Sequence, residues 1–142
     1  MQIDDPNFSI RINQAGVRKL LDEFESDIME VFWASSEPRM TVKDVHHGLC
    51  EKRDVLHGTI VSTMSRLVDK GYLSMVDTVG MANYYAANCT KEQLINSTID
   101  HIMQTLFKDF PMQTARALAA YARADLNAKI AKVQTSSVSN QN

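Results

Sequence analysis

The segment from Thr59 to Gly71 limits the possible folds of this chain more than any other. It reads TIVSTMSRLVDKG, and its apolar residues recur at the i, i+4, i+7, i+8 spacing of one helical face, while hydroxyl and charged residues fill the other faces. Gly71 stands where helix ends favour a residue that can adopt positive φ, and Lys70 suits the negative end of the helix dipole. We therefore predict a helix over residues 59–70, with Thr59 as its N-cap and one face left exposed.

The neighbouring residues predict the setting of this helix. Downstream, the runs YLSMV and NYYAA are joined by DTVGMA, which predicts a β-hairpin over residues 72–86. Upstream, the segment from Thr41 to Cys50 opens with a capping box of Thr41 and Asp44 and has apolar residues on one face, so a second helix is expected there. Residues 39–41 are expected to pair with the hairpin as a small third strand. This order is typical of a winged helix-turn-helix, although an amphipathic helix taken alone is more often an ordinary surface helix.

Two segments precede these elements. We expect Arg18 to Ser35 to form the first helix, closed by Trp33 as a core residue. The residues expected to face inward are Leu21, Phe24, Ile28, Val31 and Phe32. Residues 1–17 are mostly polar and include Pro6 and Gly16, so they are expected to form a flexible N-terminal arm. Residues 18–89 would then form one domain that is mainly α with a small β-wing.

Two further helices are predicted after the hairpin. Thr90 to Gln93 forms another capping box, and the apolar stripe that follows is too wide for the core of a small winged helix, so it should face another chain. Residues 109–111, Asp-Phe-Pro, should end this helix, and a last helix is expected over residues 112–132 before a disordered tail at 133–142. The residues expected at the contact with another chain are Leu94, Ile95, Ile99, Ile102, Met103, Leu106, Phe107, Leu118 and Ala122.

With these motifs in this order, the chain resembles the BlaI, MecI and CopY group of winged-helix repressors. LDEFESDIMEVFW over residues 21–33 is similar to the group's first helix, and TIVSTMSRLVDKG over residues 59–71 is similar to its recognition helix. Asn83, Tyr84 and Tyr85 match the aromatic strand of the wing. The resemblance covers about residues 18–122 and implies a DNA-binding domain at 18–89, a helical dimerisation domain at 90–132, and a homodimer that represses transcription from a palindromic operator in double-stranded DNA.

The resemblance also implies which residues contact DNA. The residues matching groove-facing positions of the recognition helix are Thr59, Val61, Ser62 and Arg66. The cations that flank this surface, and are expected at the DNA backbone, are Arg39, Lys43, Lys52 and Arg53. Val61 stands where the group commonly has Lys or Arg, so it can contact only a thymine methyl group.

The charge balance is unusual for a DNA-binding protein. Residues 1–90 contain nine Lys and Arg against thirteen Asp and Glu, and the wing has Met75, Asp77 and Val79 where relatives often carry basic residues. The acids are concentrated on the first helix, so a dimer could still present a basic stripe. We expect DNA binding that is weaker and more sensitive to salt than is typical of the group, or that depends more heavily on Arg39, Lys43, Lys52 and Arg53. The alternative is a winged-helix interaction module that binds a protein and has weak or no specific DNA binding.

No motif identifies a control signal. In the β-lactam-responsive branch of the group a sensor protease cuts an Asn-Phe bond, and the corresponding pair here is Ala120-Tyr121. An upstream sensor protein is therefore a partner that the resemblance implies without its cleavage site. His46 and Cys50 share one helical face, but they supply only two local ligands, so we expect no metal site and no cofactor.

Other features narrow the class of protein. The chain has no Gly-rich phosphate loop, clustered catalytic triad or paired acids, so we do not expect an enzyme. No apolar run approaches the roughly 20 residues that cross a bilayer, and the start MQIDDPNF has acids where a signal peptide carries positive charges. Its two cysteines lack CxxC spacing, which argues against a disulfide framework. We therefore expect a cytoplasmic globular protein without membrane contact.

Overall fold

The computed structural model describes residues 8–50 and 54–139, without the side chains of residues 136–139. The chain divides into two compact units, the first ending at Thr98 and the second beginning at Ile99, and each is described by itself. Among the helices of the described residues, none combines the length and apolar character that a bilayer crossing requires.

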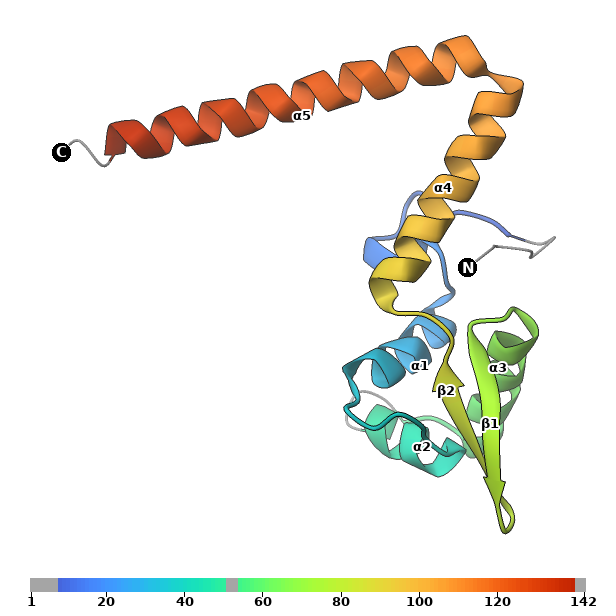
Figure 1. Cartoon of the computed structure of the whole chain (residues 1–142). Coiled ribbons are helices and arrows are strands. Elements are labelled where there is room, and N and C mark those ends of the chain that lie inside the picture. Colours follow the sequence, from blue (N-terminus) through green and yellow to red (C-terminus); the bar gives the residue numbers. More distant parts are fainter. Residues whose placement is uncertain (1–7, 51–53, 140–142) are drawn as a thin grey trace. The chain divides into compact units, whose positions relative to one another are not determined.

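The first unit is a winged helix-turn-helix (Figure 1). Its elements are a short 3-10 helix η1 (Gly16–Lys19), the helices α1 (Glu23–Ala34), α2 (Val42–Cys50) and α3 (His57–Asp69), the strands β1 (Leu73–Val79) and β2 (Ala82–Ala87), and the start of α4 (Lys91–Asp109). The expected fold class, mainly helical with a small β-wing after the third helix, is confirmed.

Both predicted capping boxes are present. At the start of α2, the Thr41 N–H donates to Asp44 Oδ2 at 2.9 Å and the Asp44 N–H donates to Thr41 Oγ1 at 3.2 Å. At the start of α4, the Thr90 N–H donates to Gln93 Oε1 at 2.9 Å and the Gln93 N–H donates to Thr90 Oγ1 at 3.1 Å. Each box satisfies N–H groups that would otherwise lack a partner in the first helical turn.

The wing is an antiparallel hairpin with a tighter turn than the predicted six-residue link. β1 and β2 are joined by Gly80 and Met81 alone, and Gly80 has φ +63° while Met81 does not have positive φ, which is the sign pattern of a type II′ turn. The pairing shifts register between Met75 and Asp77, as at a β-bulge. The expected third strand is a single bridge, in which the Met40 N–H donates to the Tyr85 carbonyl oxygen at 2.9 Å and the Tyr85 N–H donates back to the Met40 carbonyl oxygen at 2.8 Å.

The core of the first unit is built where α1, α2 and α3 meet the hairpin. Its fully buried side chains include Leu21, Ile28, Met29, Val45, Leu49, Ile60, Met64, Leu67, Leu73 and Leu94. Of the residues expected to face inward, Phe32 is also buried, while Phe24 and Val31 are partly buried against the core. Trp33 is likewise partly buried, and its Nε1–H donates to the Cys89 carbonyl oxygen at 2.9 Å, which ties the end of α1 to the end of the hairpin.

The first helix is shorter than expected. It begins at Glu23 rather than Arg18 because Asp22 is its N-cap, with the Asp22 carboxylate accepting from the Glu25 N–H at 2.8 Å. The preceding η1 places Val17 in the core, and the Arg11 N–H donates to the Lys19 carbonyl oxygen at 2.9 Å. Arg11, within the expected arm, is therefore hydrogen-bonded to η1, and residues 1–7 of the arm lie outside the described residues.

The start of α3 also differs from the prediction. The helix begins at His57, and its N-cap is Leu56, which has no side chain able to cap. The Leu56 carbonyl oxygen accepts the N–H groups of Thr59 and Ile60 at 3.1 and 3.3 Å, so the helical hydrogen bonds start before Thr59. Thr59 therefore lies in the first turn of the helix and is not its N-cap.

The second unit consists of the end of α4 and the long helix α5 (Pro111–Ser139). The predicted break is present at Phe110, and Pro111 occupies the first helical position, where a missing N–H is harmless. α5 continues past Lys132, the expected helix end, because residues 133–139 contain no Gly or Pro to stop it. These residues are helical where a disordered tail was expected, and residues 140–142 lie outside the described residues.

Candidate nucleic-acid interface

The N-terminal half of α3 presents an exposed polar face. Thr59 and Ser62 are exposed and Val61 is 42% exposed, whereas Ile60 between them is fully buried. The Ser62 hydroxyl donates to the Thr59 carbonyl oxygen at 3.1 Å, and its oxygen can still accept a hydrogen bond. The structure thus brings three of the predicted groove residues together on one accessible surface.

Arg66 lies further along α3, next to the start of α1. Its Nη2 is 3.6 Å from Asp22 Oδ2 and donates to Thr63 Oγ1 at 3.5 Å, while its side chain remains 55% exposed. Burial raises the pKa of Asp22, but its hydrogen bonds with Glu25 and the charges of Arg66 and Lys70 outweigh that effect and hold the pKa below 3.8. Arg66 therefore shares its charge with a carboxylate of its own chain.

A second ion pair, which the sequence analysis missed, joins the same two helices. Lys70 Nζ lies 2.9 Å from Glu25 Oε2, and Glu25 is buried. Burial raises the pKa of Glu25 above 4.5, the Asp22 carboxylate adds to this rise, and Lys70 opposes it. The pattern of Asp22 and Glu25 three residues apart before an apolar run is a capping-box signal that could have revealed these acids as the start of α1.

Arg39 is held by residues of the wing. Its guanidinium forms an ion pair with Asp77 and lies 4.5 Å from the centre of the Tyr84 ring. The hydrogen bond from Arg39 and a second from the Thr78 N–H lower the pKa of Asp77. Arg39, which was expected to contact the DNA backbone, is therefore ion-paired with a carboxylate of the wing.

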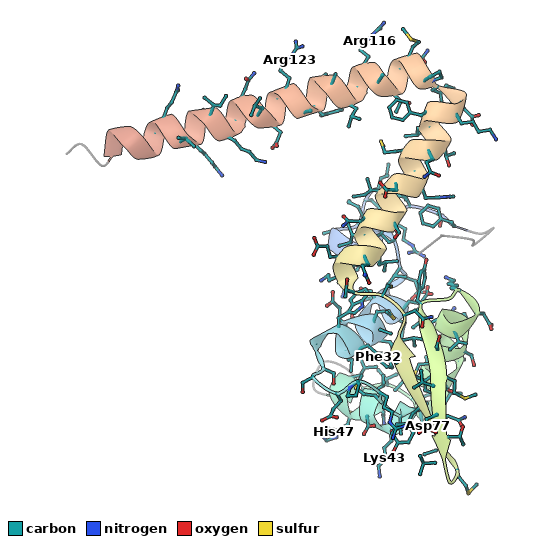
Figure 2. The ribbon with its side chains drawn as sticks, viewed as in Figure 1. Phe32, Lys43, His47, Asp77, Arg116 and Arg123 are labelled. Carbon is teal, nitrogen blue, oxygen red and sulfur yellow. The ribbon has the colours of Figure 1, made fainter. Side chains whose placement is uncertain are left out.

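Lys43 and His47 lie on the exposed side of α2. Figure 2 shows both residues, with Asp77, at the end of the first unit from which the wing projects. Arg39, Lys43 and His47 line one open hollow of about 740 Å³ between α2 and β2. Lys52 and Arg53, which were also expected to contact the DNA backbone, lie outside the described residues.

The outer part of the wing carries apolar side chains. Met75, Val76 and Val79 are each more than half exposed, and Met81 at the turn is fully exposed. Asp77 is the only charged residue in residues 73–87. The wing therefore has no cation of its own for a phosphate.

The residues predicted to contact another chain fall into three groups according to their burial. Leu94 is fully buried in the core of the first unit, so it stabilises this chain and does not face a second one. Ile95, Ile102 and Met103 are partly buried, whereas the exposed members are Ile99, Leu106, Phe107, Leu118 and Ala122. In the second unit, Leu106, Phe110, Leu118 and neighbouring side chains line an apolar hollow of about 410 Å³.

The histidines near Cys50 make contacts within the chain. His46 Nε2 lies 3.0 Å from the Val55 carbonyl oxygen, and the His46 and His57 rings are 6.2 Å apart in an edge-on arrangement. Across the described residues, no group of three or more His, Cys, Asp or Glu side chains is placed to hold a metal ion. Cys50 is exposed and Cys89 is buried, and burial raises the pKa of the Cys89 thiol.

The structure is that of a winged helix-turn-helix protein. It has three helices followed by a two-stranded wing, and the N-terminal half of α3 is exposed. The chain belongs to the penicillinase repressor family, whose model matches residues 21–134. The matched segment includes all three motifs on which the resemblance was based, at residues 21–33, 59–71 and 83–85. The family is one of repressors rather than enzymes, in agreement with the sequence analysis.

Curated relatives include the transcriptional regulator BlaI of Mycobacterium tuberculosis, strains CDC 1551 and H37Rv. Each is 25% identical over 84 residues, which covers 59% of this chain and 60% of the relative's length. Solved structures that the comparison matched include H. salinarum RosR, at 21% identity and a TM-score of 0.45 over 78% of this chain and 98% of that one. The hsRosR-S4 complex has 20% identity and a TM-score of 0.45 over 76% of this chain and 91% of that one.

Proposed function

We propose that this protein is a homodimeric transcriptional repressor that binds a palindromic operator in double-stranded DNA through α3. The observation that carries the proposal is the exposed face of Thr59, Val61 and Ser62 at the start of α3, in a chain of the penicillinase repressor family. Winged helices and other helix-turn-helix proteins read the major groove with the N-terminal residues of this helix. The protein acts in the cytoplasm, and an upstream sensor protein is a further proposed partner.

Four exposed residues of α3 have a role in this proposal. Thr59 and Ser62 carry short hydroxyl groups that can donate to and accept from base edges, and Val61 can contact a thymine methyl group. Arg66 has the longest reach, and it approaches DNA from the position in which Asp22 holds it, 3.6 Å away. The resulting surface is small and nearly neutral, so shape and methyl contacts contribute more than charge.

Phosphate contacts set the register of α3 in the groove. Lys43 on α2 is the exposed cation best placed for this role, because among the described residues no ion pair within the chain engages it. The charge that Arg39 can offer to a phosphate is reduced by its ion pair with Asp77. Lys52 and Arg53 are proposed as additional backbone contacts.

Dimerisation supplies the second half-site. α5 is exposed along its described side chains, and Leu118, Leu126 and Ile130 are 51%, 58% and 46% exposed. A helix with this much exposed apolar surface is normally covered by another helix. A second copy of the chain covers it here, and its two-fold symmetry matches the palindrome.

The proposal is tested by selecting duplexes from a random-sequence library with the full-length protein. A repressor of this kind enriches a palindromic consensus, and its affinity for that consensus falls as salt rises because phosphate contacts release counterions. A library that yields no consensus, from protein that is folded and dimeric, overturns the proposal.

The wing favours one alternative function. Because its exposed residues are apolar and its charged residue is acidic, the wing fits a protein partner at least as well as a phosphate backbone. Under this alternative the chain is a winged-helix interaction module with weak or no specific DNA binding. Binding that is equally weak for every duplex, and flat with salt, favours this alternative.

A further inference from the structure

A buried ion pair connects the end of α3 to the first turn of α1. Lys70, the C-cap residue of α3, places Nζ 2.9 Å and 3.2 Å from the two carboxylate oxygens of Glu25. The Glu25 side chain is 2% exposed and that of Lys70 is 33% exposed. A carboxylate this deeply buried needs a nearby cation to remain ionised, so the two side chains hold each other in place.

The neighbouring pair acts between the same two turns. Asp22 caps α1, and its Oδ2 lies 3.6 Å from Arg66 Nη2. Both acids therefore sit at the N-terminus of α1 and both cations at the C-terminus of α3, where each charge is favoured by the dipole of its own helix. Because each helix carries its two charged residues in a single terminal turn, the two ion pairs form only when these turns face each other.

The anchored cations lie on the same stripe of α3 as the exposed hydroxyl residues. At 100° per residue, Thr59, Ser62, Arg66 and Lys70 fall within about 80° of one another around the helix axis. The first half of this stripe is exposed, and the second half is fixed to α1 by Glu25 and Asp22. Rotation of α3 by one residue would both break the pairs and turn Thr59 and Ser62 away from their present direction.

We infer that Glu25 and Lys70 are positioning residues that set the rotation of α3, and thereby aim Thr59 and Ser62 at the bases. The inference rests on the proposed DNA-reading function. Apolar residues of similar volume could give the chain an equal free energy of unfolding. They would lack the charged donor and acceptor that hold the last turn of α3 against the first turn of α1 in one orientation.

Four variants of the full chain separate positioning from other roles. The variants are Glu25→Gln, Lys70→Arg, the double variant Glu25→Met/Lys70→Met, and Lys91→Met. Lys91→Met is the matched control, because Lys91 pairs with Glu30 of α1 at 2.5 Å without involving α3. Affinity is measured for the duplex selected by the wild-type protein and for a scrambled duplex, after thermal unfolding has identified the variants that fold.

Positioning predicts a loss of specificity alone. Glu25→Gln and the double variant should lose about tenfold or more in affinity for the selected duplex, the cost of a misread base pair, with no loss of affinity for the scrambled duplex. Lys70→Arg, which keeps the charge and the hydrogen bonds, and the control Lys91→Met should retain the wild-type ratio. Glu25→Gln is the sharpest variant because removal of a negative charge would, by electrostatics alone, raise affinity for both duplexes.

Three results would overturn the inference. The first is a rise in affinity for both duplexes in Glu25→Gln, and the second is an equal fall in affinity for both duplexes in the Lys70 variants. The third is a loss of specificity in Lys91→Met that equals the loss in Glu25→Gln. If the wild-type protein selects no consensus, the proposed function fails, and amide hydrogen exchange then tests the inference without DNA. Positioning predicts faster exchange in the last turns of α3 in the double variant, at an unchanged unfolding temperature. Unchanged exchange there would also overturn it.

Discussion

The guanidinium of Arg39 is ion-paired with the carboxylate of Asp77, across the bridge between residue 40 and the wing. The Arg39 guanidinium also lies 4.5 Å from the centre of the Tyr84 ring, so two side chains of the wing hold Arg39 in place. The Asp77 carboxylate therefore offsets part of the charge that Arg39 can offer to a phosphate. Under the proposed function, the wing weakens binding to any duplex that offers charge alone.

Removal of this carboxylate should strengthen DNA binding. Asp77→Asn is expected to raise affinity for a scrambled duplex by about 1.5- to 5-fold, the range that corresponds to an exposed ion pair. The control is Asp69→Asn, which removes the same charge from the exposed end of α3. Equal effects of the two substitutions in fluorescence anisotropy would show that Asp77 acts only through net charge.

Glu25 should give stability a distinct pH dependence. Because burial raises its pKa above 4.5, the folded protein keeps this proton to higher pH than the unfolded chain does. Its contribution to the free energy of unfolding therefore falls as pH rises from 4.5 through the raised pKa. Urea unfolding at several pH values should show the wild-type protein losing stability relative to Glu25→Gln over this window.

Asp22 acts in a lower pH range and with the opposite sign. Its pKa is held below 3.8, so its contribution is present above 3.8 and is lost as pH falls through the lowered pKa. Measurements above pH 4.5 therefore report mainly on Glu25. A wild-type protein that gains stability relative to Glu25→Gln as pH rises there would contradict the burial argument.

Two glycines with open surroundings should respond in opposite ways to alanine. A Cβ added at Gly58 or at Gly80 would meet no atom within 4 Å, but Gly80 has φ +63° and Gly58 lies inside α3. Gly80→Ala should destabilise the protein by about 1–2 kcal/mol, since L-residues are strained at that φ. Gly58→Ala should stabilise it by about 0.5–1 kcal/mol. Chemical unfolding of both variants tests the difference, and two changes of the same sign would contradict the assigned backbone geometry.

The apolar surface of the second unit should control the oligomeric state. Leu118→Glu places a charge twice in a symmetric interface, so the protein should sediment as a monomer. Asn127→Glu is the matched control because residue 127 is exposed on the opposite side of α5. If both variants remain dimeric, the interface lies elsewhere.

Local sequence signals predicted most of the first unit. The capping boxes at Thr41 and Thr90 and the break before Pro111 are short-range features, and the structure contains all three. The start of α3 was harder to predict because its N-cap, Leu56, makes no side-chain hydrogen bond and leaves no signal in the sequence. The wing was predicted, but its turn was placed too broadly because the strands extend to Val79 and from Ala82.

The candidate site was only partly predictable for a different reason. The exposure of Thr59 and Ser62 follows from helical periodicity, which fixes which face is buried. The partners of Arg39, Arg66 and Lys70 lie 38, 44 and 45 residues away in the sequence. No local pattern identifies such pairs, so the cations that flank the reading surface were expected to be free for DNA.

The most direct test of the central claim is a comparison of the duplexes selected by the wild-type protein and by Ser62→Ala. Ser62 is exposed in the N-terminal half of α3, and alanine removes its hydrogen-bonding oxygen with little change in helix stability. We predict a palindromic consensus for the wild-type protein, and a consensus for Ser62→Ala that loses its preference at one base pair in each half-site and keeps the others. An identical consensus from the two proteins, or none from either, would contradict the claim that this face of α3 reads DNA.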